Sequence, residues 1–103
     1  MASVIWTEPA LKDLNNITEF ISKDSEFYAS KFTKRIFEIT KKLALYADIG
    51  KPVPELKPLL YKQILFTKYR IIYRVTSAKV YIISVHHSSR LLSNNETFKD
   101  IFE

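Results

Sequence analysis

The sequence predicts an α+β fold in which an N-terminal strand precedes an antiparallel helical hairpin, an antiparallel β-meander and a short C-terminal helix. Three observations predict this order. Apolar residues recur at spacings of three and four through the first half of the chain. A segment with two prolines and the only glycine then interrupts the pattern. From residue 61 onward, apolar and polar residues alternate, which is the period of a strand. We expect residues 1–103 to form a single domain.

The first half contains the predicted strand and both predicted helices. Ser3-Val4-Ile5-Trp6 is a short run of strand-forming residues, and Thr7 can cap a helix that has Pro9 in its first turn. The apolar stripe of this helix, about 15 residues long, consists of Leu11, Leu14, Ile17 or Thr18, and Ile21. After a break at residues 22–25, a second stripe consists of Tyr28, Phe32, Ile36, Ile39, Leu43 and Tyr46. Two amphipathic helices joined by so short a link predict an antiparallel hairpin.

The second half begins with a non-helical loop over residues 48–54, in which we expect Gly50 near the end of the second helix. Lys57-Pro58 extends this irregular segment. Strands follow at residues 61–66, 69–75 and 80–85. Strict alternation directs one set of side chains toward the hairpin: Tyr69, Ile71, Tyr73, Tyr81, Ile83 and Val85. The opposite face carries Arg70, Arg74, Ser84 and His86. Asn94 or Asn95 can cap a last helix whose apolar side is Phe98, Ile101 and Phe102.

Composition excludes several classes of protein. The chain has no cysteine, which excludes disulfides, thiol nucleophiles and thiolate metal sites and fits a reducing cytoplasm. A single glycine excludes the glycine-rich phosphate loops of nucleotide-binding folds. Two histidines without cysteine also argue against a structural zinc site, and we expect neither a cofactor nor a metal. No apolar run approaches the roughly 18–20 residues of a membrane span, and no secretion signal is visible. We therefore expect a cytoplasmic protein without a membrane partner.

Positive charge is concentrated in one part of the chain. Residues 1–50 carry equal numbers of acidic and basic groups. Residues 51–93 carry a single acid, Glu55. Their basic residues are Lys51, Lys57, Lys62, Lys68, Arg70, Arg74, Lys79 and Arg90. Such a field attracts phosphate backbones or an acidic protein, although a basic surface without a partner is the simpler alternative. We expect Lys62, Arg70, Arg74 and Arg90 to gather on one open side of the sheet.

Four segments together resemble a known family. They are V-I-W-T-E-P-A-L-K-D-L, D-I-G-K-P-V-P-E-L, Y-K-Q-I-L-F-T-K-Y-R-I-I-Y-R-V and V-Y-I-I-S-V-H-H-S-S-R. In this order and spacing, the chain resembles the ParE/RelE superfamily of bacterial type II toxins over nearly its whole length. The resemblance implies a small fold like that of microbial ribonucleases. It also implies a cognate antitoxin that wraps the toxin and neutralises it.

The superfamily divides by target. RelE-type members cut mRNA in the ribosome with basic residues and no metal, whereas ParE-type members poison DNA gyrase. Lys62 and Arg70 match two residues of the RelE-type nuclease set. The second lysine of that set is here Ile64, and the arginine after the last strand is displaced by two residues to Arg90. No tyrosine follows Tyr81, where that set has one. These departures favour the ParE type.

The residues also indicate how RNA cleavage would work if the chain were a nuclease. Cleavage through the 2′-hydroxyl needs a base, an acid and cations that stabilise the phosphorane charge. His86 or His87 could transfer protons, and Arg70, Arg74 and Arg90 could hold phosphate beside Lys62. Alternation favours His86 at an open site and His87 in a structural role. The alternative is that the arginines form ion pairs with carboxylates of the helices or of an antitoxin, and that both histidines are structural.

Three functions follow from these observations. We expect a type II toxin that inhibits growth when free of its antitoxin, by ParE-like poisoning of DNA gyrase. A RelE-like, metal-independent mRNA endonuclease acting on the ribosome is the alternative, and a non-toxic adaptor that keeps the fold is the third. The antitoxin is expected to contribute an acidic, partly disordered segment. The residues expected to bind target or antitoxin are Lys62, Lys68, Arg70, Arg74, His87 and Arg90.

Overall fold

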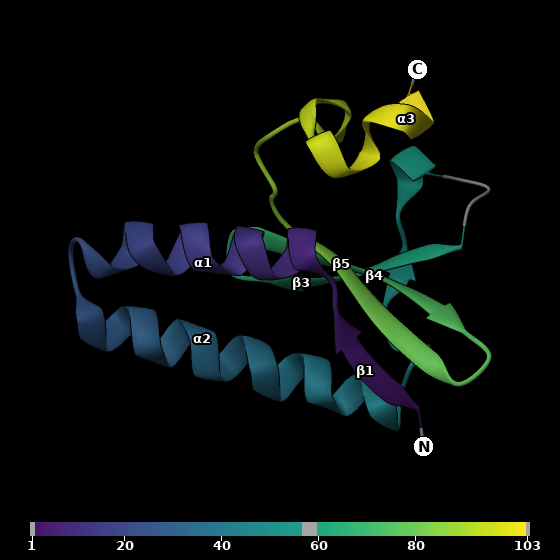
Figure 1. The fold of residues 1–103 in the computed structure, drawn as a ribbon, viewed down its shortest axis with the longest axis horizontal. Coiled ribbons are helices and arrows are strands. Elements are labelled where there is room, and N and C mark those ends of the chain that lie inside the picture. The colour runs from purple at the N-terminus through teal and green to yellow at the C-terminus, as the bar shows by residue number, and fades with distance from the viewer. Residues whose placement is uncertain (1, 57–59, 103) are drawn as a thin grey trace.

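A five-stranded sheet separates the helical hairpin on one face from the C-terminal segment on the other (Figure 1). The computed structural model describes residues 2–56 and 60–102. The elements are β1 (Ser3–Trp6), α1 (Glu8–Ser22), α2 (Glu26–Lys41), β2 (Lys51–Pro52), β3 (Tyr61–Phe66), β4 (Tyr69–Thr76), β5 (Lys79–His87) and α3 (Lys99–Phe102). Short 3₁₀ turns lie at Lys42–Ala44, Pro54–Leu56, Leu92–Asn94 and Glu96–Phe98. The predicted α+β order is confirmed, with β2 as an added edge strand.

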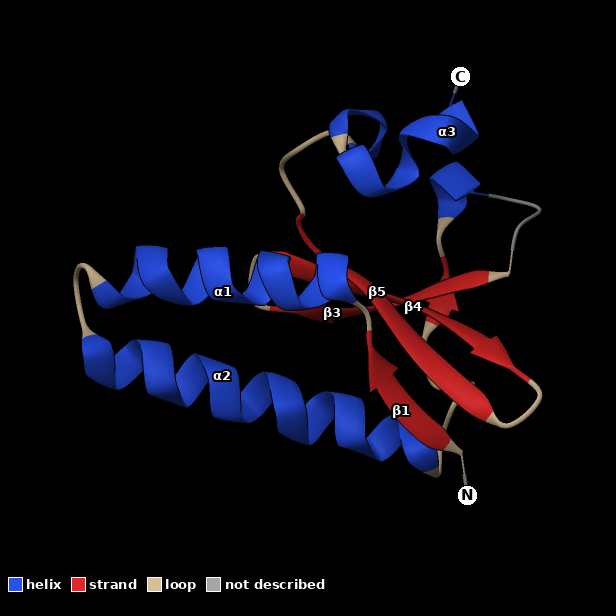
Figure 2. Cartoon of the chain, viewed as in Figure 1, coloured by secondary structure: helices blue, strands red, loops and turns tan. Residues whose placement is uncertain are grey.

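The strands are ordered β1-β5-β4-β3-β2 across the sheet. Figure 2 shows the strands in red beside the blue helices. β1 runs parallel to β5, and the remaining neighbours are antiparallel, so β3, β4 and β5 form the predicted meander. Among the described residues, no helix combines the length and the apolar character that a membrane crossing requires.

The hairpin forms where its caps and stripes predict it. Thr7 accepts a hydrogen bond from the N–H of Ala10, and Ser25 accepts one from the N–H of Tyr28. The main core buries Ala10, Leu14, Ile36, Leu43, Ile71, Tyr73, Val80, Ile82 and Val85 between hairpin and sheet. Tyr28 and Tyr46, at the two ends of the predicted second stripe, are exposed instead. The stripe is longer than the surface that can cover it.

A β-bulge in β5 changes which residues face the hairpin. Ile72 pairs with Ser84 but Tyr73 pairs with Ile82, so Ile83 is an extra residue in the ladder. One extra residue inverts the alternation on one side of the bulge. Val80 and Ile82 therefore face the hairpin, and the predicted assignment of Tyr81 and Ile83 to that face is wrong. Ile83 packs against the second core on the opposite face.

Gly50 has a different role from the predicted helix end. α2 ends at Lys41, and Gly50 directly precedes β2. The Gly50 N–H donates to Tyr73 Oη at 2.9 Å, and a Cβ atom at Gly50 would lie 2.5 Å from that oxygen. The glycine is thus required by a close approach of backbone to side chain. The predicted irregular conformation of Lys57-Pro58 lies outside the described residues.

The C-terminal segment packs on the face of the sheet that points away from the hairpin. Its buried residues Leu92 and Phe98 form a second core with Val53, Leu56 and Ile72. The Asn95 side chain accepts from the N–H of Thr97 and so caps the 3₁₀ turn that leads into α3, as predicted for this residue. This segment, together with the turn Pro54–Leu56, covers part of the polar face.

Candidate functional site

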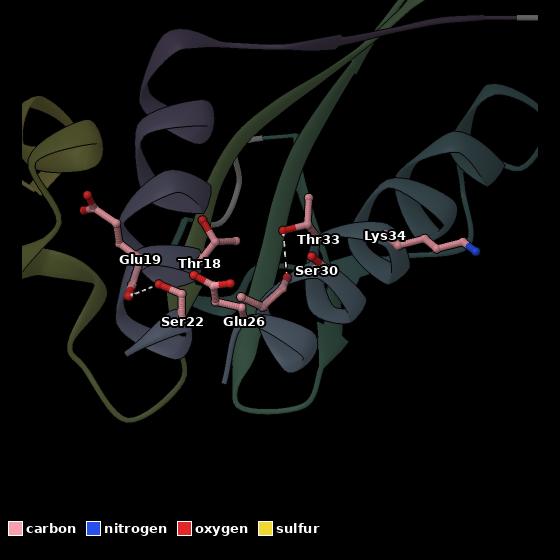
Figure 3. Close-up of a pocket in the computed structure, with 8 residues that line it drawn as sticks. Thr18, Glu19, Ser22, Glu26, Ser30, Thr33 and Lys34 are labelled. Atoms are coloured by element: carbon pink, nitrogen blue, oxygen red, sulfur yellow. Dashed lines mark hydrogen bonds between the residues drawn. The ribbon is translucent and has the colours of Figure 1, made fainter. Parts of the chain in front are cut away.

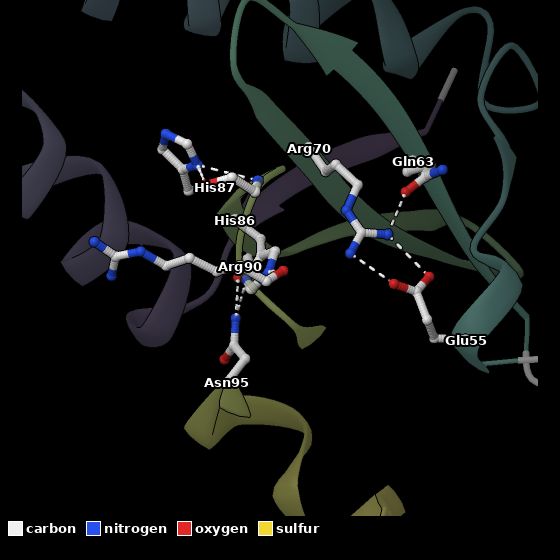
Figure 4. A network of polar contacts seen from close by, with 9 residues as sticks. Glu55, Gln63, Arg70, His86, His87, Arg90 and Asn95 are labelled. Carbon is white, nitrogen blue, oxygen red and sulfur yellow. Dashed lines mark hydrogen bonds and ion pairs between the residues drawn. The ribbon is translucent and has the colours of Figure 1, made fainter. Parts of the chain in front are cut away.

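Arg70, Arg74, Ser84 and His86 lie on the sheet face opposite the hairpin, as the alternation predicts, but they do not form an open surface. Figure 4 shows Arg70 and His86 with the polar side chains that contact them. Arg70 and His86 are direct neighbours in the β4–β5 register. Arg70, Ser84 and His86 are all buried. Among the described residues, every fully buried side-chain nitrogen and oxygen has a hydrogen-bond partner. The face therefore carries a closed polar network.

Arg70 is held by two side chains of the chain itself. Its Nη1 and Nη2 donate to Glu55 Oε1 and Oε2 at 2.9 and 2.8 Å, a bidentate ion pair. Nη1 also donates to Gln63 Oε1 at 3.1 Å. The Arg70 side chain is 10% exposed, whereas that of Glu55 is 38% exposed. The hydrogen bond from Arg70 is the main reason why the pKa of Glu55 is lowered from its ordinary value.

Both ring nitrogens of His86 are engaged. Nε2 lies 2.9 Å from the carbonyl oxygen of Arg90, which can only accept, so Nε2 carries the hydrogen. Because Asn95 Oδ1 already accepts from the N–H of Thr97, the amide nitrogen of Asn95 faces the ring and donates to Nδ1 at 3.0 Å. His86 therefore ties the C-terminal segment to the sheet through both ring nitrogens.

The burial of the two histidines differs from the prediction. His86 is only 6% exposed, so the prediction of an open site there is wrong. The reason is the C-terminal segment, which folds over this face. His87 is half-buried at the end of β5, where its ring packs edge-on against Tyr69. Its Nδ1 accepts from the Ser89 N–H at 3.2 Å.

Asp13 belongs to the same network and was not among the predicted site residues. Its Oδ2 accepts from Ser84 Oγ at 2.8 Å and from the Val85 N–H at 3.0 Å, beside the bulge in β5. Burial raises the pKa of Asp13, and the hydrogen bond from Ser84 opposes part of that rise. The sequence contained a signal for this residue. Asp13 follows Ala10 by three positions, which places a carboxylate beside the apolar stripe of α1.

The other predicted cations lie apart from Arg70. Lys62 on β3 pairs with Tyr73 on β4, which belongs to the main core, so Lys62 lies on the hairpin side of the sheet and Arg70 on the other. Arg74 is exposed, with its Cζ 5.6 Å from the centroid of the Tyr61 ring. Lys68 and Arg90 lie at one end of the sheet, where the Lys68 carbonyl accepts from the Ser88 N–H. The expectation of one open cluster containing Lys62, Arg70, Arg74 and Arg90 is therefore wrong.

One surface hollow is remote from this network. A groove of about 590 Å³ lies between α1 and α2 near the tip of the hairpin (Figure 3). Its lining consists largely of small and hydroxyl side chains, among them Thr18, Ser22, Ser30 and Thr33. In the parts of the chain that the structure describes, three or more candidate metal ligands never come together.

Comparison with known proteins gives concordant results. Residues 4–92 match the family described as "ParE toxin of type II toxin-antitoxin system, parDE". "Toxin RelE2" of Caulobacter vibrioides is 31% identical over 91 residues, which cover 88% of this chain and 100% of that protein. The solved structure titled "Chromosomal ParDE TA system from P. aeruginosa" aligns with a TM-score of 0.71 and 23% identity, covering 84% of this chain and 96% of that one. This last likeness supports the fold.

Proposed function

Because this chain belongs to the ParE toxin family of type II toxin–antitoxin systems, we propose that it arrests growth by poisoning DNA gyrase when no antitoxin is bound. The family match, together with the 31% identity to a toxin named RelE2, makes the chain a type II toxin of the ParE/RelE superfamily. What we propose beyond this family membership is the target, DNA gyrase. Since gyrase acts on the bacterial chromosome, the proposal places the protein in the cytoplasm.

The state of Arg70 is the observation that supports gyrase over mRNA. Metal-free RNA cleavage needs cations and proton-transfer groups that are free to contact one phosphate. Arg70 is bound by Glu55 and Gln63, and both ring nitrogens of His86 are used within the chain. Lys62 lies on the other side of the sheet. The described residues thus place the predicted nuclease groups in separate or occupied positions.

A supercoiling assay tests the proposed target. The purified chain, gyrase, ATP and relaxed plasmid should give blocked supercoiling or trapped, cleaved plasmid. Addition of the cognate antitoxin should restore supercoiling. The matched control is a ribosome assay with translating mRNA, in which we expect intact message. An inert gyrase reaction beside mRNA cut on ribosomes would reverse the assignment.

The mRNA endonuclease is the second candidate because one relative carries the name RelE2 and because Arg70 and His86 are neighbours in the β4–β5 register. A nuclease predicts that Arg70→Ala or His86→Ala abolishes toxicity while the fold survives. The third candidate, a non-toxic adaptor, predicts that expression without antitoxin leaves growth unchanged. Expression of the chain in a host that lacks the antitoxin separates the adaptor from both toxic activities.

The cognate antitoxin is the proposed partner, and its acidic segment is expected to contact exposed cations. Lys68, Arg74 and Arg90 are exposed, in contrast to Arg70. His87 and Lys62 are partly exposed and remain candidates for the edge of the same contact. A disordered acidic segment that folds on contact can reach cations that are spread over the surface of the toxin.

A further inference from the structure

The turn that follows β5 brings a hydroxyl group and an imidazole together at the surface. Ser89 Oγ lies 2.7 Å from His87 Nδ1, and the Ser89 N–H donates to the same nitrogen at 3.2 Å. A backbone N–H can only donate, so Nδ1 is the ring nitrogen without a hydrogen, and the Ser89 hydroxyl donates to it. A hydroxyl within hydrogen-bond reach of an imidazole base is the arrangement that activates serine as a nucleophile.

The sheet holds the imidazole, whereas the hydroxyl is open to solvent. His87 is the last residue of β5, and its ring packs edge-on against the Tyr69 ring with the centroids 5.3 Å apart. Ser89 lies beyond the strand in an exposed turn. His86, the preceding residue, is buried, and its ring contacts the C-terminal segment. A small molecule can therefore reach the pair formed by His87 and Ser89 without any change in the fold.

A strained turn next to this pair helps to fix its position. The Ser88 N–H donates to the Lys68 carbonyl at 2.8 Å, which joins the turn after β5 to the turn between β3 and β4. In that second turn Thr67 has a φ of 51°, a left-handed conformation that is unfavourable for a β-branched residue. Strained residues persist where the surrounding structure holds them, and they cluster at functional sites. The strain therefore supports a role for this end of the sheet beyond that of a connecting loop.

Two exposed cations belong to the same end of the sheet. Lys68 lies in the turn that contacts Ser88, and Arg90 follows Ser89 directly. The Arg90 N–H donates to the His87 carbonyl at 3.1 Å, which closes the turn that carries the serine. Positive charge beside a nucleophile attracts anionic molecules and stabilises negative charge that develops on a departing group. The surroundings of Ser89 therefore favour a reaction in which the leaving group departs as an anion.

We propose that Ser89 is a covalent modification site at which His87 activates the hydroxyl toward acyl donors with an anionic leaving group, such as acyl phosphates and phenolic esters. Ser89 Oγ attacks the carbonyl carbon of the donor and forms a new C–O bond, while His87 Nδ1 takes the hydroxyl proton. The bond between that carbon and the leaving group breaks, and the leaving group departs with the bonding electrons. His87 then passes the proton to solvent, and Ser89 remains as an acyl ester. This inference is independent of the proposed gyrase target.

The test treats the purified chain with p-nitrophenyl acetate and locates the acetyl group by peptide mass spectrometry over a time course. Ser88 is an internal comparison, because it is an equally exposed neighbour whose side chain makes no hydrogen bond to His87 among the described contacts. A general base contributes about 10²–10⁴-fold to such a reaction, so we expect Ser89 to be acetylated at least about tenfold faster than Ser88. His87→Ala should lower the rate at Ser89 by at least the same factor.

Ser88→Ala is the matched control and should leave the acetylation of Ser89 unchanged. His87→Gln is a second variant, since glutamine can accept the hydrogen bond from Ser89 but cannot take its proton. The proposal is overturned if Ser88 and Ser89 react at equal rates, or if folded His87→Gln retains the wild-type rate at Ser89. The contact between the two side chains is then a turn hydrogen bond only. If both His87 variants unfold, the comparison of Ser89 with Ser88 in the wild-type chain decides.

Discussion

Asp13 and Glu55 are two carboxylates of the same polar face whose pKa values are shifted in opposite directions. Burial raises the pKa of Asp13, and the hydrogen bond from Arg70 lowers that of Glu55. A lowered pKa means that Glu55 stabilises the fold above its unfolded pKa and loses that contribution as the pH falls through its folded value. A raised pKa means that Asp13 favours the fold at low pH, and this contribution is lost as the pH rises through its folded value.

We predict that Glu55→Gln removes part of the acid sensitivity of the protein. With Glu55 ionised and paired in the wild type, protonation below its ordinary pKa breaks the pair with Arg70. The variant has no such proton to bind, so its stability should change less between neutral and strongly acidic pH. The measurement is the melting temperature of both proteins as a function of pH. Parallel curves for the two proteins would contradict the assigned role of the pair.

Asp13 gives a second prediction for a single residue. Asp13→Ala removes the acceptor for both Ser84 Oγ and the Val85 N–H, two groups beside the bulge in β5. Because Ser84 is fully buried, we expect a loss of about 1–3 kcal/mol in unfolding free energy. Urea denaturation measures it. Asp24→Ala, in the link between α1 and α2, is the control and should change stability by less than about 0.5 kcal/mol. Equal effects of both substitutions would show that the bulge does not depend on Asp13.

The residues of the candidate site show what alternation can and cannot predict. It placed Arg70, Arg74, Ser84 and His86 on one face, which the structure confirms. It could not predict that Glu55 would bind Arg70 or that Asn95 would bind His86, because both contacts join segments that lie apart in the sequence. The burial of a residue on a sheet face depends on which segment of the chain packs against that face. The sequence pattern of a strand contains no information about which segment this is.

At the scale of elements, the strands and helices were predictable because their local signals agree. Caps, stripe spacing and Pro9 indicate the limits of α1 and the start of α2, whereas the predicted stripe of the second helix runs past its observed end at Lys41. The bulge in β5 is the main departure. Ile82 and Ile83 are chemically equivalent for a buried face, so the apolar run through this strand is compatible with either alternation. Packing decides between the two alternations, because Ile82 packs in the main core and Ile83 packs against the second core.

The C-terminal segment is predicted to depend on one aromatic anchor. Phe98 is 1% exposed and packs edge-on against Tyr61, whereas Phe102 is 39% exposed. Phe98→Ala should cost about 3–5 kcal/mol of stability and release the segment from the sheet. Hydrogen exchange at the backbone N–H of position 98, which donates to the Asn95 carbonyl, would then become fast. Phe102→Ala is the matched control and should leave that exchange slow. Slow exchange in both variants would show that other contacts hold the segment.

For the whole molecule, positive charge is concentrated in one part of the chain. The hairpin half is nearly neutral, and the sheet half carries the excess of positive charge. Fold class and toxin family were predictable from the sequence because they depend on the order of whole segments. The positions of the cations were not predictable from the sequence. β3 and β4 direct Lys62 and Arg70 to opposite sides of the sheet, and Glu55 forms an ion pair with Arg70. The exposed cations that remain are separated rather than clustered.

This arrangement predicts that charge controls how fast the antitoxin binds more than how tightly it binds. Exposed cations that make no ion pair in the described chain, such as Lys68, Arg74 and Arg90, attract an acidic segment over a distance set by salt screening. The association rate constant with the cognate antitoxin should therefore fall on the order of tenfold when these three residues are replaced by alanine. The same variant should lose most of the salt dependence of that rate in stopped-flow measurements. Replacement of Lys31, Lys34 and Lys41 on α2 removes an equal charge from the hairpin and should have a smaller effect. Equal effects of the two triple variants would mean that net charge alone, rather than its position on the sheet half, steers the encounter.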